Sequence, residues 1–173
     1  MSAFDSVRMP VQGFERTNNA MDYIVVKWVH ILSSTILFGT GIGSAFYLFM
    51  ANREKNIAGI HFATVHVVIA DWLFTAPTII IQFATGMRLL HLTGYSWSDR
   101  WVRWGIVLYV FAGLCWLPVV WMQIKMRDMA KVALETGAAL PQTYWRLDRW
   151  WIIAGSLAFP AVIVIFYLMV AKP

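Results

Sequence analysis

The chain has 173 residues, of which 60% are hydrophobic and only 13% are charged, and its net charge is +5. Soluble domains carry about 25% charged residues, so this composition excludes a soluble globular protein. The basic residues form no patch with interleaved aromatic residues, which argues against nucleic-acid binding and favours contact with the anionic headgroups of a lipid bilayer. A single cysteine, Cys115, excludes an internal disulfide and a cysteine-based metal cluster.

Residues 1–20 are polar and lack periodicity, and we interpret them as an N-terminal tail before a single transmembrane domain at 21–173. Four apolar stretches follow, at 28–52, 56–87, 104–123 and 150–171. Each exceeds or equals the roughly 20 residues that a helix needs to cross a bilayer. Lipid permits only helices or closed barrels, and these stretches do not alternate as barrel strands would. The sequence therefore predicts an all-α fold, an antiparallel four-helix transmembrane bundle.

The first apolar stretch carries a spacing of small residues and a histidine. Gly39 and Gly43 lie four residues apart, the spacing that lets two helix backbones approach closely in lipid. We expect both glycines to be buried against a neighbouring helix. His30 lies about two turns into the stretch and is followed by the polar run 33–35, so it is a candidate for function at membrane depth.

The second stretch is the longest and contains an acidic residue. A helix over about 59–91 would be roughly 48 Å long, so it must tilt, protrude or kink at Pro77. Asp71 is the only charged residue in the four stretches. Such a residue costs about 2.5–3.5 kcal/mol to insert, which makes it a functional candidate. His66 lies about 140° away around the helix, yet it could line one polar path together with Asp71 and Gln82.

The third and fourth stretches predict a hairpin that extends beyond the membrane near residues 125–148. The third helix should continue to about Glu135 and stop at Gly137, and the fourth should begin near Pro141, because proline is favoured at helix starts. Asp148 is expected on the solvated flank of this hairpin.

Orientation follows less directly from the sequence. With Met1 outside the cytoplasm, seven basic residues fall on each side of the membrane, so the positive-inside rule does not distinguish the two orientations. The densest basic cluster lies in the connection between the third and fourth helices. We therefore expect a multi-pass protein of a bacterial inner membrane with both termini outside the cytoplasm.

The run Lys27-Trp28-Val29-His30-Ile31, together with Gly39 and Arg53, resembles the first helix of HemJ-type protoporphyrinogen oxidases and of the related CopD-like copper-resistance membrane proteins. The ending at 162–173 is similar to the HemJ ending. Over residues 23–173 the chain is most similar to an uncharacterised bacterial family of predicted integral membrane proteins.

The resemblance implies a haem b contact for one residue, His30, as axial ligand of the iron. The third helix departs from the HemJ pattern, because Arg103 and then Cys115-Trp116 stand where HemJ-like proteins carry a lysine and a histidine. Arg88 and Arg103 could hold haem propionates, since arginine suits planar carboxylates. His30, His66 and His91 lie at different depths in a spanning helix, so we expect no bis-histidine site within one chain.

Three classes of function remain open from the sequence. The first is a haem- or porphyrin-associated redox membrane protein with His30 as axial ligand. The second is a non-catalytic structural or assembly subunit, acting as a homo-oligomer or with a membrane partner subunit. The third is a small transport or permeation protein that uses Asp71 and His66. No residue is assigned a catalytic role.

Overall fold

The computed structural model describes residues 11–173, and these residues form helices without any strand. In chain order the helices are α1 Val11–Glu54, α2 Ile57–Ala70, the π-helix η1 Asp71–Thr75, α3 Ala76–Thr93, α4 Arg100–Thr136 and α5 Gln142–Ala171. Four spans are long and apolar enough to cross a membrane, with α2, η1 and α3 forming one of them. The predicted all-α four-helix architecture is confirmed. Of the predicted tail at residues 1–20, residues 1–10 lie outside the described residues and residues 11–20 belong to α1.

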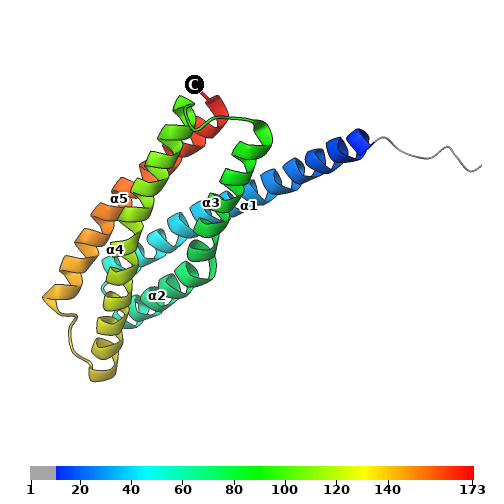
Figure 1. Cartoon of the computed structure of the whole chain (residues 1–173). Helices are drawn as coiled ribbons and strands as arrows, with labels where there is room; N and C mark the ends of the chain where they lie inside the picture. The colour runs from blue at the N-terminus through cyan, green and yellow to red at the C-terminus, as the bar shows by residue number, and fades with distance from the viewer. Residues whose placement is uncertain (1–10) are drawn as a thin grey trace, which may run out of the picture.

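The four spans form two pairs, α4 with α5 and α1 with the span made of α2, η1 and α3 (Figure 1). Helices α4 and α5 run side by side as an antiparallel hairpin, and α4 also packs against α2. Helix α1 crosses the molecule at an angle and packs against α3 and α2. We call the end where α4 turns into α5 the hairpin end.

The helix ends follow local backbone chemistry. Gly94 and Gly137 have positive φ values of 72° and 67°, and they end α3 and α4 in the left-handed conformation that glycine adopts without steric cost. Pro141 is the cap residue directly before α5. The predicted stop at Gly137 and the predicted start near Pro141 are thus confirmed.

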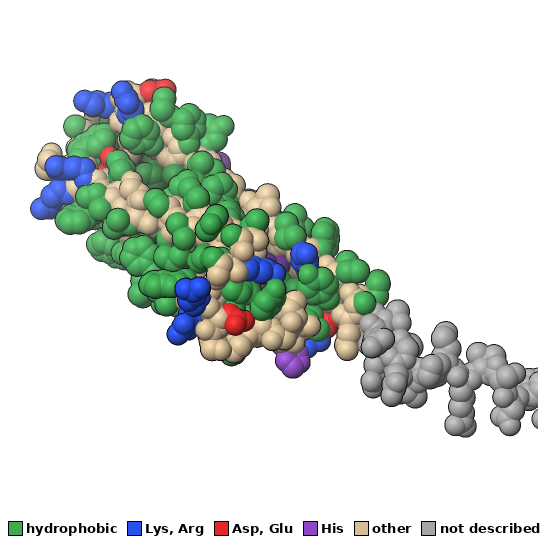
Figure 2. Space-filling view, turned by 90° about the horizontal axis from the view of Figure 1, so that it is seen from above, with side chains coloured by type: hydrophobic (Ala, Val, Ile, Leu, Met, Phe, Trp, Pro, Cys, Tyr) green, Lys and Arg blue, Asp and Glu red, His purple; other side chains and the backbone are tan. Residues whose placement is uncertain are grey.

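Buried apolar side chains gather at the two ends of the bundle. The larger cluster, at the hairpin end, joins α1, α2, α4 and α5, and it consists of Leu48, Ile60, Ala63, Val67, Met122, Met126, Ala130, Tyr144 and Trp151. The smaller cluster, at the opposite end, consists of Trp101, Val102 and Leu168. Figure 2 shows two separate groups of Lys and Arg side chains, with hydrophobic side chains covering the surface between them. This distribution suits a body surrounded by lipid.

The prediction that Gly39 and Gly43 pack against a neighbouring helix is wrong. A Cβ atom added at either glycine would meet nothing within 4 Å. The neighbouring Phe38 stacks on Phe159 of α5 with ring centroids 4.9 Å apart, so α1 meets α5 through aromatic rings. Instead, the glycines line an open groove of about 590 Å³ between α1 and the α2–η1 segment, which also includes His66.

Replacing Gly39 or Gly43 with Leu is therefore expected not to lower the free energy of unfolding, and leucine's higher helix propensity adds up to about 0.8 kcal/mol. The reason is that a Cβ atom at either position meets nothing within 4 Å and the groove beside it is open. Thermal unfolding of the two variants in detergent, followed by helical circular dichroism, measures the effect. A large loss of stability would show that another helix covers this face.

Candidate functional site

His30 of α1 lies at the contact with α3, and a chain of hydrogen bonds fixes its tautomer. His30 Nδ1 lies 2.8 Å from Thr85 Oγ1, and the Thr85 hydroxyl donates its own hydrogen to the carbonyl of Ile81 at 2.6 Å. Thr85 must then accept from Nδ1–H, so the lone pair of the ring lies on Nε2. Nε2 has no partner among the described residues. Metal-binding histidines are oriented in this way, with the other ring N–H donated to a fixed acceptor.

Gln82 holds the backbone around His30 from the side of α3. Its Nε2 donates to the His30 carbonyl at 2.6 Å and to Ser33 Oγ at 2.9 Å. Ser34 and Thr35 both donate to the Ile31 carbonyl within α1, so Ser33 is the member of the polar run that joins the site. The α1–α3 contact thus carries a polar cluster of His30, Ser33, Gln82 and Thr85.

Two features of α3 set the surroundings of the His30 ring. A Cβ atom on Gly86 would lie 3.5 Å from His30 Cε1, so the ring lies over a bare stretch of backbone. Arg88, three residues after Thr85, forms an ion pair with Asp22 of α1 and donates to it from Nε at 3.1 Å. The Arg88 guanidinium is thus bonded to Asp22, which lies eight residues before His30 on α1.

Arg103, the other arginine predicted to hold a haem propionate, lies exposed on α4. No hydrogen bond or ion pair joins it to His30 or Arg88 among the described residues. The structure does not bring Arg103 into the same site.

Asp71 lies in a second polar cluster, where the helix changes direction between α2 and α3 (Figure 1). The amide of Ala76 donates to the Asp71 carbonyl, the five-residue spacing of a π-turn, and Pro77 follows directly. Because proline has no N–H to continue the regular ladder, the bend forms one turn before it. Thr75 Oγ1 donates to Asp71 Oδ1 at 2.9 Å, and Gln123 of α4 lies beside the same carboxyl group.

His66 faces away from this cluster. Its Nδ1 donates to the Phe62 carbonyl at 2.7 Å, its ring packs on Phe62 with centroids 4.0 Å apart, and it lines the open groove. Gln82 belongs to the His30 cluster instead. The polar path that Asp71, His66 and Gln82 could form is therefore not assembled in the described structure.

A third polar cluster, which sequence reasoning missed, ties α1 to α5 at the hairpin end. Tyr144 Oη donates to Asn52 Oδ1 at 2.6 Å, and Asn52 Nδ2 donates to Asp148 Oδ1 at 2.8 Å. All three side chains are buried, so the prediction of Asp148 on a solvated flank is wrong. Asp148 is buried because it accepts a hydrogen bond from Asn52, which is distant in the sequence. The spacing of residues within α5 does not indicate such a partner.

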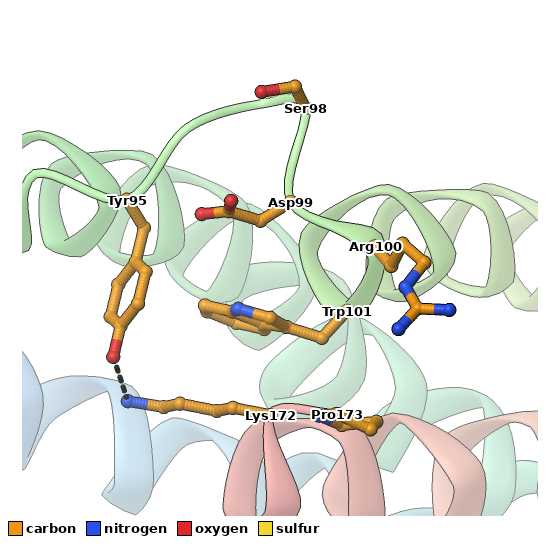
Figure 3. A pocket seen from close by; sticks show the side chains of 7 residues that line it. All are labelled: Tyr95, Ser98, Asp99, Arg100, Trp101, Lys172 and Pro173. Carbon is orange, nitrogen blue, oxygen red and sulfur yellow. Dashed lines mark hydrogen bonds between the residues drawn. The ribbon is translucent and has the colours of Figure 1, made fainter.

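An open pocket of about 490 Å³ lies at the opposite end of the bundle, between the α3–α4 connection and the C-terminus of α5 (Figure 3). Lys172 Nζ donates to Tyr95 Oη at 3.3 Å and lies 5.5 Å from the centroid of the Trp101 ring. These contacts hold the end of α5 against the α3–α4 connection.

Among the described residues no group of three or more His, Cys, Asp or Glu side chains could hold a metal ion. Comparisons with curated proteins and with solved structures found no match. A family model does match residues 24–173, which is most of the chain and includes all three polar clusters. The chain therefore belongs to DUF2269, a family described as predicted integral membrane proteins, and it spans the membrane with four helices.

Proposed function

We propose that this integral membrane protein binds haem b with His30 as the single axial ligand and acts as a haem- or porphyrin-associated redox protein. The observation that carries the proposal is the hydrogen bond from His30 Nδ1 to Thr85, which leaves the Nε2 lone pair available. The resemblance of the run around His30 to the first helix of HemJ-type proteins implies the same residue. A bound haem would supply one-electron chemistry.

The residues around His30 fit such a group in their chemistry. Thr85 fixes the ring orientation, and Gln82 fixes the backbone of His30 from α3. Lys27 and Arg88 supply positive charge for propionates on the same two helices. Lys27 now lies over the Tyr23 ring at 5.4 Å and Arg88 pairs with Asp22, so both would exchange an existing contact for a propionate. No second histidine reaches His30 among the described contacts, which favours a five-coordinate iron.

The test is the absorption spectrum of protein expressed with ample haem and purified in detergent. The wild type is expected to show a Soret band, and His30→Ala is expected to lose it. His66→Ala is the matched control, because His66 also donates from Nδ1 to an oxygen and leaves Nε2 unprotonated. Arg88→Ala is expected to weaken haem retention without abolishing it, since it would remove a propionate contact and not an iron ligand.

Three results would contradict this assignment. A colourless wild type would remove the haem proposal, and haem retained by His30→Ala would keep the cofactor but discard the site. Haem lost only by His66→Ala would move the ligand to the open groove.

The alternative function is a non-catalytic assembly subunit, and the uncovered face at Gly39 and Gly43 favours it. It predicts a colourless protein that co-purifies with one fixed membrane partner. Replacing Gly43 with Trp should then release that partner, whereas His30→Ala should not.

A further inference from the structure

We propose that Asp71 is a reversible proton-binding site within the membrane, formed with Thr75 and Gln123 and separate from the His30 cluster. The three side chains come from η1 and α4 and are 5%, 5% and 4% exposed. Asp71 lies 14 residues after Ile57 and 22 before Thr93, so it is about 21 Å and 33 Å along the helix from the ends of its span. This places an ionisable group well inside the hydrocarbon.

In the part of the chain that the structure describes, no positively charged side chain pairs with Asp71. The ion pairs among the described residues join other side chains, and the groups that touch the carboxyl are a hydroxyl and an amide. An ionised carboxylate in an apolar interior without a cationic partner is costly, so taking up a proton is the favoured response.

Among the described residues, no titratable side chain of the surrounding helices is hydrogen-bonded to or ion-paired with the Asp71 carboxyl group. His30 of α1 is directed at Thr85, and His66 of α2 is directed at the Phe62 carbonyl. On α3 the first ionisable residue after Asp71 is Arg88, which pairs with Asp22. On α4, Lys125 is exposed two residues beyond Gln123. Asp71 is therefore the group that takes the proton.

The hydrogen bonds of the cluster are incomplete without a proton. Thr75 uses its one hydrogen for Asp71 Oδ1. Asp71 Oδ2 and Gln123 Oε1 are both buried and both lack a donor among the described residues. Protonation converts Asp71 Oδ2 from an acceptor into a donor. The cluster then contains one unsatisfied acceptor fewer, and no other hydrogen bond is lost.

The same partners also suit the ionised form, which makes the binding reversible. An amide offers both a donor and an acceptor, so Gln123 can donate to a carboxylate or accept from a carboxylic acid. The Thr75 hydroxyl donates to Oδ1 in either state. The π-turn, a feature frequent at functional sites, places the Thr75 hydroxyl within hydrogen-bond distance of the Asp71 carboxyl group.

Infrared difference spectroscopy of the detergent-purified full chain tests the proposal. The wild type is expected to show a carboxylic-acid C=O band that disappears as the pH is raised and returns when it is lowered. This band should be absent from Asp71→Asn. Asp148→Asn is the matched control, because Asp148 is also a buried aspartate at the end of a hydrogen-bond chain, and it should retain the band.

Further variants separate the outcomes. Asp71→Glu keeps the acid and should shift the band, which assigns it even if Asp71→Asn folds poorly. Gln123→Leu should move the midpoint of the titration without removing the band. A band that is the same at every pH, or no band that depends on residue 71, would overturn the proposal. Loss of the band on adding Na⁺ at constant pH would also overturn it, in favour of a metal cation. None of these readouts depends on His30, so failure of the haem proposal leaves this test intact.

Discussion

Replacing Trp151 with Ala is expected to lower the free energy of unfolding by about 3 kcal/mol, whereas Trp150→Ala should have a much smaller effect. Trp151 is 7% exposed within the buried cluster at the hairpin end, and Trp150 is 62% exposed. Truncating a packed tryptophan costs about 3–5 kcal/mol in soluble cores. A loss at the lower end of this range is expected here. Apolar side chains of a membrane protein contact lipid or other helices equally well, so the cost of the truncation comes mainly from lost packing contacts.

Thermal unfolding in detergent, followed by helical circular dichroism, measures both variants without relying on tryptophan fluorescence. The two positions are adjacent in the sequence and change the composition equally, so each is the control for the other. Equal losses of stability would contradict the packing of α5, because they would mean that both rings contribute to the same buried surface.

The architecture could be predicted because lipid imposes it. A bilayer demands about 20 apolar residues per helix and excludes open strands, so the four spans follow from composition and length. The end of α4 at Gly137 and the start of α5 after Pro141 were also predictable, because glycine and proline act on the local backbone. These are properties of the sequence within a few residues.

Packing between helices could not be predicted in the same way. Gly39 and Gly43 permit a close approach, but they face an open groove towards α2 and η1, and no helix fills it among the described residues. Small residues show where two helices could meet, but the arrangement of the whole bundle decides whether they do. The same sequence pattern is therefore consistent with both a closed seam and an open groove.

The same distinction between local and tertiary information applies to the polar residues. His30 and Asp71 could be singled out because each is costly at membrane depth. Their partners could not, since Thr85 and Gln123 lie on other elements and reach these residues through the tertiary fold. The bend near Pro77 was predictable as one of three outcomes, and the structure shows that it takes the form of a π-turn at Asp71.

Asn52→Leu is expected to destabilise the protein by about 3 kcal/mol, because it removes the centre of the buried cluster that joins α1 to α5. Asn52 accepts from Tyr144 and donates to Asp148, so one substitution leaves a buried hydroxyl and a buried carboxyl without their partner. Each unsatisfied group costs about 1–3 kcal/mol, and more if it is charged. Tyr144→Phe should cost only about 1 kcal/mol, since it removes one bond and keeps the ring in its packed position.

The double variant Asn52→Leu/Asp148→Leu distinguishes a hydrogen-bond effect from a change of volume. When both partners of a buried polar pair become apolar, no carboxyl is left unsatisfied, and the net cost of the pair can approach zero. Chemical unfolding in detergent should therefore show the double variant to be more stable than Asn52→Leu alone, even though it carries one more substitution. A double variant that is less stable than the single one would mean that the volume and shape of Asn52 and Asp148, and not their hydrogen bonds, hold α1 against α5.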